Sequence, residues 1–74
     1  MADTSDDEQH RRELFERLYG AHYDAVARYA LRRTDSPDDA VDVLGETFMT
    51  AWRRLEDIPD GDNATRLWLY GVAR

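Results

Sequence analysis

The sequence contains no cysteine and no lysine, and it has no long apolar run. Without cysteine, neither a disulfide nor a cysteine-based zinc site can supplement the core, and nothing indicates an oxidising compartment. The apolar runs extend over only a few residues, far short of the roughly 20 that span a bilayer, and the acidic start MADTSDDEQ lacks the features of a secretory signal. We therefore expect a cytoplasmic protein without membrane contact, whose 74 residues form one small domain held together by packing.

The chain has no excess of basic charge, because 16 acidic residues outnumber 10 basic ones, all arginines, and the net charge is −6. Phosphate contacts usually show as a basic excess, so bulk electrostatics argue against a nucleic-acid binder. The distribution qualifies this argument, because much of the negative charge lies near the N-terminus and in two acidic turns. The paired arginines also have a simpler role, since cations near the C-terminal end of a helix complement its dipole. These pairs are Arg11 with Arg12, Arg32 with Arg33, and Arg53 with Arg54.

A first helix is expected from about Gln9 to Arg33, preceded by a disordered acidic tail over residues 1–9. The tail is almost free of apolar side chains, so burial cannot offset the entropy lost on ordering. Within the helix, Gly20 indicates either a close approach of the backbone to a neighbour or a bend. Apolar and aromatic residues recur at three- and four-residue steps, the spacing of one helical face: Leu14, Phe15, Leu18, His22, Val26, Tyr29 and Ala30.

The segment TDSPDDAVD marks the start of a second helix. Ser36 can cap it, Pro37 fits its first position, and Asp38 and Asp39 favour the positive end of its dipole. The helix is expected to run to about Leu55. Its inward stripe comprises Ala40, Val43 or Leu44, Thr47, Phe48, Ala51, Trp52 and Leu55.

A loop, EDIPDGDNA, separates this helix from a third that begins near Ala64. Pro59 and Gly61 act as breakers, and Asp62 or Asn63 provides the next cap. The third helix, TRLWLYGVAR, has no closing signal, so we expect it to be cut within the helix at the end of the chain. Its apolar positions are Leu67, Trp68, Tyr70 and Val72. Together the patterns predict an all-α fold, a small three-helix bundle with antiparallel first and second helices.

No pattern predicts an enzyme, a metal site or a cofactor. His22 and Asp24 do not share a helical face, and His10 lies at the fraying end of the first helix. Neither a metalloprotease motif, a phosphate-binding loop nor a nucleophile elbow occurs. We therefore expect a binding protein.

Three features remain open to two interpretations each. Asp38, Asp42 and Glu46 follow at i, i+4 and i+8 on the second helix, and the repulsion among them indicates either a basic partner or a solvated face. The loop residues Asp62 and Asn63 can contact base edges or simply form a turn and cap. The aromatic residues can stack on unpaired bases or form the core: Tyr29, Trp52, Trp68 and Tyr70.

The order of these motifs resembles region 2 of the extracytoplasmic-function (ECF) sigma factors of bacterial RNA polymerase, within the sigma-70 family. The likeness extends from about Leu14 to Arg74, and four features recur in order. These are the opening FERLYGAHYDAVARYA, the acidic turn after Arg33, the helix DVLGETFMTAWR and the final WLYGVAR. The resemblance implies one region 2 domain over residues 10–74 that binds core polymerase and takes part in recognising and melting the minus-10 promoter element.

In that family, the helix matching Asp38 to Arg54 docks on the clamp helices of the polymerase β′ subunit, which present basic side chains. The resemblance therefore gives the acidic stripe a partner. Family members commonly have Gln where this chain has Gly45, so one interface side chain is missing here. The implied polymerase-binding residues are Asp38, Asp42, Glu46, Met49 and Arg53.

The loop before the last helix captures, in that family, a base flipped out of the non-template strand of promoter DNA. The resemblance implies that Trp68 and Tyr70 anchor the last helix to the core. It also implies a set of DNA contacts in the loop and in the last helix: Asp62, Asn63, Thr65, Arg66 and Arg74.

Family members normally continue to a region 4 domain that reads the minus-35 element, and we expect this second domain to be absent from the chain. Many relatives are held inactive by an anti-sigma factor that covers the same surfaces. The alternative function is therefore a protein-interaction module whose main partner is an anti-sigma factor or a second copy of the chain.

Overall fold

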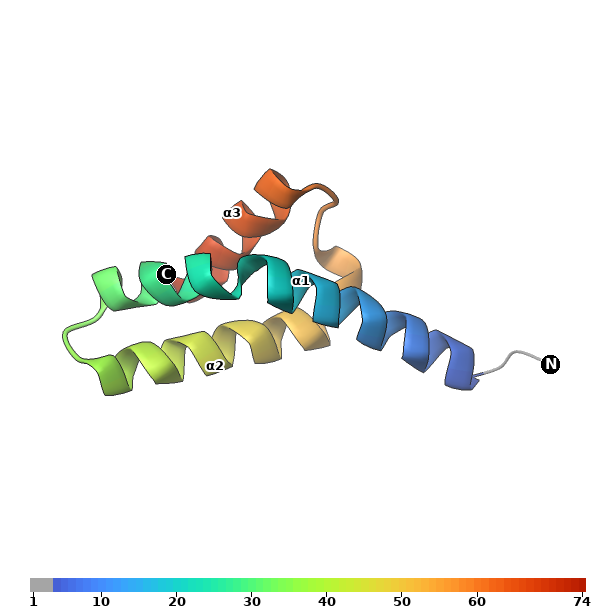
Figure 1. The fold of residues 1–74 in the computed structure, drawn as a ribbon, viewed down its shortest axis with the longest axis horizontal. Helices are drawn as coiled ribbons and strands as arrows, with labels where there is room; N and C mark the ends of the chain where they lie inside the picture. Colours follow the sequence, from blue (N-terminus) through green and yellow to red (C-terminus); the bar gives the residue numbers. More distant parts are fainter. Residues whose placement is uncertain (1–3) are drawn as a thin grey trace.

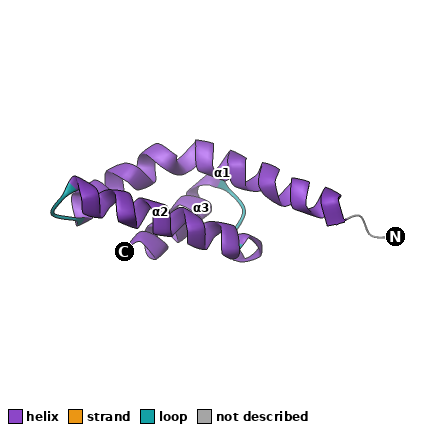
Figure 2. Cartoon of the chain, turned by 90° about the horizontal axis from the view of Figure 1, so that it is seen from below, coloured by secondary structure: helices purple, strands orange, loops and turns teal. Residues whose placement is uncertain are grey.

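A computed structural model describes residues 4–74, and Figure 1 shows that they form a bundle of three α-helices. The elements are α1 (Thr4–Arg33), α2 (Pro37–Arg53), a short 3-10 helix η1 (Leu55–Asp57) and α3 (Asp62–Ala73). α1 and α2 run antiparallel along each other, and α3 crosses the pair (Figures 1 and 2). The predicted all-α bundle is thereby confirmed. Within the described part, no helix combines the length and the apolar character of a membrane span.

α1 begins earlier than the sequence predicted, and its first turns project beyond the bundle (Figure 1). Residues 4–9 of the expected disordered tail belong to this helix, and residues 1–3 lie outside the described part. Local interactions explain the difference, because Asp6 and Asp7 lie at the positive end of the helix dipole. The side-chain amide of Gln9 also donates a hydrogen bond to the Glu13 carboxylate one turn later, at 3.4 Å.

The start of α2 confirms the predicted cap. Ser36 has an extended backbone, and its hydroxyl oxygen accepts a hydrogen bond from the Asp39 amide at 3.1 Å. Pro37 occupies the first turn, where no donor is needed. The helix ends at Arg53, so Leu55, which was expected at its end, belongs to η1 instead.

The core draws on all three helices. Val26 of α1, Phe48 and Ala51 of α2, and Leu69 of α3 are buried together. Trp68 and Tyr70 pack against this cluster, which agrees with their expected role as anchors. Gly20 does not mark a close approach, because a Cβ atom built there would meet no atom within 4 Å.

The inward face of α3 differs from the expected one. Leu69 is fully buried and lies between Thr65 and Ala73, one turn away on either side, whereas Leu67 is 60% exposed. The expected apolar positions of this helix included Leu67 but not Leu69. Four consecutive large apolar residues leave the inward face of a helix undetermined by periodicity, so packing against α1 and α2 selects it.

Candidate functional site

The outer face of α2 brings together the five residues that the sequence assigned to polymerase. All of them are exposed on one side of the helix: Asp38, Asp42, Glu46, Met49 and Arg53. The Arg53 guanidinium donates a hydrogen bond to the Met49 sulfur at 3.4 Å. The two salt bridges found within residues 4–74 involve other carboxylates, so the acidic stripe carries charge that the described residues do not neutralise.

This face is divided along its length into an apolar and an acidic edge. On the α1 side, Val41 is 65% exposed and Trp52 is 39% exposed. Trp52 was expected in the inward stripe, but it lies at the border of the α1–α2 contact, where its ring meets Phe15 edge-on at 5.4 Å. On the α3 side, Asp42 and Glu46 line a shallow hollow of about 280 Å³.

Arg74 lies at that same hollow, which the end of α3 helps to form. The sequence assigned Arg74 to DNA together with Asp62 and Asn63, which stand at the opposite end of the helix. Twelve helical residues extend over roughly 18 Å, at about 1.5 Å each. The structure therefore places Arg74 beside the polymerase-assigned carboxylates and away from the other DNA-assigned residues.

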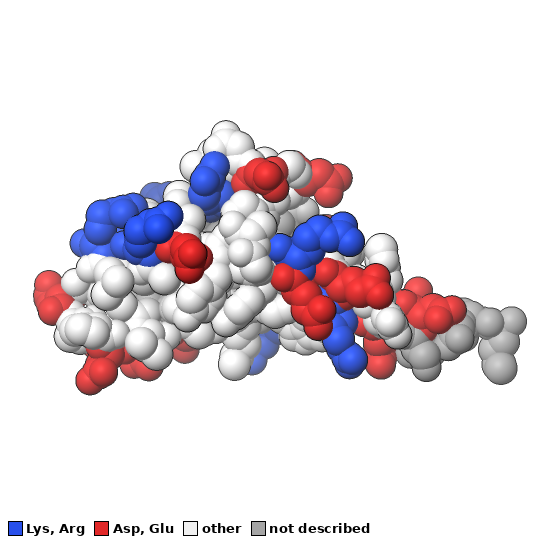
Figure 3. All heavy atoms as spheres, in the orientation of Figure 1, with Lys and Arg blue, Asp and Glu red and all other residues white. Residues whose placement is uncertain are grey.

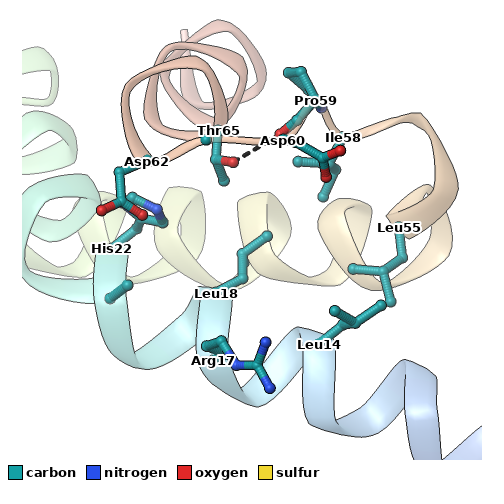
Figure 4. Close-up of a pocket in the computed structure, with 12 residues that line it drawn as sticks. Leu14, Arg17, Leu18, His22, Leu55, Ile58, Pro59, Asp60, Asp62 and Thr65 are labelled. Atoms are coloured by element: carbon teal, nitrogen blue, oxygen red, sulfur yellow. Dashed lines mark hydrogen bonds between the residues drawn. The ribbon is translucent and has the colours of Figure 1, made fainter.

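A second hollow, here called the loop pocket, lies between α1 and the chain that connects α2 to α3 (Figure 4). Its volume is about 280 Å³. Apolar side chains from both sides form its walls, with charged groups from Arg17, Asp60 and Asp62 among the lining residues. The apolar members are Leu14, Leu18 and Ala21 from α1, and Leu55, Ile58 and Pro59 from the connecting chain.

Two local features shape the connecting chain. Gly61 has φ of +98°, a conformation that L side chains rarely adopt, and this turn directs the chain into α3. The Thr65 hydroxyl donates a hydrogen bond to the Pro59 carbonyl at 2.8 Å, and the Thr65 amide donates to the Gly61 carbonyl at 2.9 Å. The first bond folds the connecting chain back over the first turn of α3 (Figure 4), and the second is the first hydrogen bond within that helix.

Thr65, one of the expected DNA contacts, is held by the connecting chain. It is only 8% exposed, and its hydroxyl hydrogen is committed to Pro59. Asp62 lines the loop pocket, Asn63 is exposed next to it, and Arg66 is half-buried one turn into α3. Of the five DNA-assigned residues, the pocket lining thus includes only Asp62 and Thr65.

Sequence reasoning missed two polar residues of this pocket. His22 is 5% exposed and contributes to the pocket wall, although its place in the inward stripe was predicted. Arg17 brings a positive charge to the same wall. Its spacing of three residues from Leu14 and four from Ala21 is a signal that could have indicated a shared face. Among the described residues, no cluster of three or more acidic, histidine or cysteine side chains could hold a metal ion.

Charge is unevenly distributed over the surface. Figure 3 shows arginines gathered over the C-terminal part of α1, whereas acidic side chains follow the edge where α2 begins. Arg28, Arg32 and Arg33 are the exposed basic residues of this part of α1, and the Arg33 guanidinium lies over the Tyr29 ring at 5.6 Å. A chain of negative net charge therefore still presents a local basic area.

Residues 18–74, more than half of the chain, match the family model for sigma-70 region 2. The chain belongs to the sigma-70 region 2 family. This result confirms the family indicated by the order of motifs. The match includes all of α2, η1 and α3, and thus both the outer face of α2 and the connecting chain of the loop pocket. Members of this family are in general not enzymes.

Two named relatives support the same assignment. The region 2 chain is 43% identical over 61 residues to the ECF RNA polymerase sigma factor SigL of Mycobacterium tuberculosis. The aligned part covers 82% of this chain and 34% of SigL. It is 34% identical over 62 residues to the RNA polymerase sigma factor YlaC of Bacillus subtilis, and the aligned part covers 84% of this chain and 35% of YlaC. The chain thus spans about a third of the length of these relatives. No solved structure gave a significant match.

Proposed function

We propose that this chain acts as region 2 of a sigma factor in transcription initiation. It binds core RNA polymerase through the outer face of α2, and it takes part in recognising and melting the minus-10 promoter element. The observation that carries the proposal is the exposed acidic stripe of Asp38, Asp42 and Glu46, on a helix that lies wholly within the family match. The function also implies a cytoplasmic location, where polymerase works.

The chemistry of α2 fits a partner made of basic helices. Like charges spaced at i and i+4 repel by a few tenths of a kcal/mol per pair, and a partner's basic side chains relieve this repulsion. Exposed apolar area lies beside the acidic residues, on Val41, Met49 and Trp52. Burial of this area supplies binding free energy, whereas salt screens the attraction between exposed charges. Gly45 lies between these groups without a side chain, so this position adds no hydrogen bond to the proposed interface.

The loop pocket fits a single flat, partly polar group. Its volume of about 280 Å³ lies just below the range of roughly 300–1,000 Å³ typical of larger small-molecule sites. Extruding a base from the stack costs a few kcal/mol of free energy. Contacts of the base with the apolar walls and with polar groups at the rim offset this cost. Asp62 and Asn63 are the proposed polar contacts, and Arg66 the proposed phosphate contact.

Two of the predicted DNA residues take different places in this proposal. Thr65 acts indirectly, by holding the Pro59 carbonyl and thus the shape of the connecting chain. Arg74 would meet DNA only at the far end of α3. Arg28, Arg32 and Arg33 form a further basic area at the end of α1 for the phosphate backbone.

The docking claim is tested by binding to isolated β′ clamp helices. Asp42→Arg combined with Glu46→Arg is expected to abolish measurable binding, because attraction becomes repulsion. A matched control, Glu16→Arg with Asp24→Arg, makes the same change in net charge at exposed positions of α1 and should retain most of the affinity. If the α2 variant binds as well as the parent, docking through this face is refuted.

The DNA claim is tested with single-stranded and duplex oligonucleotides across a range of salt concentrations. We expect weak binding to single strands that falls as salt rises, because few phosphates can be neutralised. Asn63→Ala should weaken the single-strand complex. Strong, salt-independent binding to duplex DNA would contradict the proposal.

The alternative function is an interaction module for an anti-sigma factor or for a second copy of the chain. Exposed apolar side chains favour it, since Leu31 is 53% exposed and Leu67 is 60% exposed away from the outer face of α2. Sedimentation over a range of concentrations separates self-association from a monomer. A monomer that binds clamp helices supports the main proposal.

A further inference from the structure

Arg11, near the start of α1, makes three contacts with the end of α2 and the chain that follows it. Its Nη2 donates a hydrogen bond to the Trp52 carbonyl oxygen at 2.8 Å. Its other terminal nitrogen, Nη1, forms a salt bridge with Glu56 in η1. Its guanidinium carbon lies 5.0 Å from the centre of the Trp52 ring. One side chain thus joins residues that are 41 and 45 positions away in the sequence.

The geometry uses the properties that distinguish arginine from lysine. Trp52 is in the last turn of α2, where carbonyl oxygens have no partner within the helix and attract a cation. The planar guanidinium can donate in two directions at once while its face covers an aromatic ring. A lysine ammonium in the same place keeps the charge but loses this fixed fork.

The contacts of Arg11 bear directly on the loop pocket. Glu56 lies between Leu55 and Ile58, which line the pocket from the connecting chain, and Leu14 lines it from α1 one turn after Arg11. Arg11 therefore ties the two walls of the pocket together at one end. The connecting chain has two other anchors, and each joins residues close together in the sequence. These are the hydrogen bond from Thr65 to Pro59 and the salt bridge between Arg54 and Asp57 at 3.3 Å.

We propose that Arg11 is a positioning residue, which sets the distance between α1 and η1 and thereby the width of the loop pocket. The same contacts fix the pocket relative to the C-terminal end of α2, and so relative to the docking helix. Arg11 lies before residue 18, where the family match begins, so this tie is an addition to the matched region. The part of the inference that concerns a bound base rests on the proposed function.

The first test measures amide hydrogen exchange in the full chain without DNA. The Asp57 and Ile58 amides form the hydrogen bonds of η1, to Arg54 at 2.9 Å and to Leu55 at 3.3 Å. Arg11→Lys and Glu56→Gln should speed exchange at these two amides about tenfold, the effect of losing one charge-assisted hydrogen bond. The exposed neighbour provides the control, since Arg12→Lys should leave both rates unchanged.

Core amides distinguish positioning from general stabilisation. The Val26 and Leu69 amides should keep their protection in Arg11→Lys, because the change is confined to the tie. Equal acceleration at every amide, or no acceleration at Asp57 and Ile58, would overturn the proposal and leave an ordinary surface ion pair, which adds little.

The second test measures binding of single-stranded DNA and of clamp helices by the same variants. Arg11→Lys should weaken single-strand binding about tenfold and weaken clamp-helix binding much less, because Arg11 contacts only Trp52 of the docking face, whereas Arg12→Lys alters neither. Unchanged DNA binding despite a loosened η1 would refute a role of Arg11 in the pocket. If the parent binds no single-stranded DNA, the proposed base capture fails, and the exchange data alone decide whether Arg11 positions η1.

Discussion

Tyr29 of α1 and Tyr70 of α3 stack nearly face to face, with ring centres 4.5 Å apart and ring planes inclined by 13°. Both rings are partly buried, and Tyr70 packs against the core cluster that includes Val26 and Leu69. The stack fixes the end of α3 against the end of α1. It therefore holds the helix whose opposite end closes the loop pocket.

The stack should appear as coupling in a double-mutant cycle. Tyr29→Ala and Tyr70→Ala are each expected to lower the free energy of unfolding, with a coupling of about 0.5–1.5 kcal/mol between them. Tyr19 serves as the control partner, because its ring packs on Phe48 at 4.8 Å instead. Urea unfolding of the single and double variants measures both cycles. Equal coupling of Tyr70 with Tyr19 and with Tyr29 would contradict the assignment.

The two leucines of α3 should respond very differently to truncation. Leu69→Ala leaves a cavity at a fully buried position and should cost about 2–5 kcal/mol, enough to unfold much of a domain this small. Leu67→Ala removes a side chain that is 60% exposed and should change stability by less than about 0.5 kcal/mol. Thermal unfolding followed by circular dichroism tests the order. A greater loss for Leu67→Ala would show that α3 packs through another face.

Two glycines should give opposite responses to alanine. Gly45 is helical with open space around its Cβ position, so Gly45→Ala should stabilise the chain by about 0.5–1 kcal/mol. Gly61 has positive φ, so Gly61→Ala should destabilise it by about 1 kcal/mol or more. Urea midpoints measure both effects. A shift of the same sign for both variants would contradict one of the two backbone assignments.

Gly45→Gln should strengthen docking on β′ clamp helices about three- to tenfold, the effect of one added hydrogen bond. The reason is the position of Gly45 on the outer face of α2, where a glutamine side chain adds an amide that can donate and accept hydrogen bonds beside Asp42 and Glu46. Gly20→Gln is the matched control, since Gly20 is also exposed and helical with open space at its Cβ position. Titration of clamp helices compares the two variants. An equal gain for both would attribute the effect to helix stability and not to the interface.

Much of the fold was predictable because local signals agreed with one another. Ser36 and Pro37 mark the start of α2 through cap chemistry, which depends on neighbouring residues alone. The contrast between apolar and polar positions along α2 predicted its buried residues Ala40, Thr47 and Ala51. Periodicity fails where that contrast is missing, as in the Leu67 to Tyr70 run of α3.

The candidate site was predictable only in part. Exposure of Asp42 and Glu46 follows from helical spacing and was predicted. The low exposure of Thr65 and the 39% exposure of Trp52 were not predicted, since each residue lies at a border where a neighbouring segment decides its exposure. The contact between Arg11 and Glu56 has no local signal, because no pattern relates residues 45 positions apart.

The sequence by itself determined three helices, their boundaries to within a few residues at α2 and α3, the acidic stripe and the family. These properties depend on interactions between residues close in the chain, which spacing and cap chemistry record. Only the tertiary structure decided which face of α3 is buried, how α1 and the connecting chain enclose the loop pocket, and what Arg11 holds together. These depend on how the helices cross, which the combined packing of all three selects.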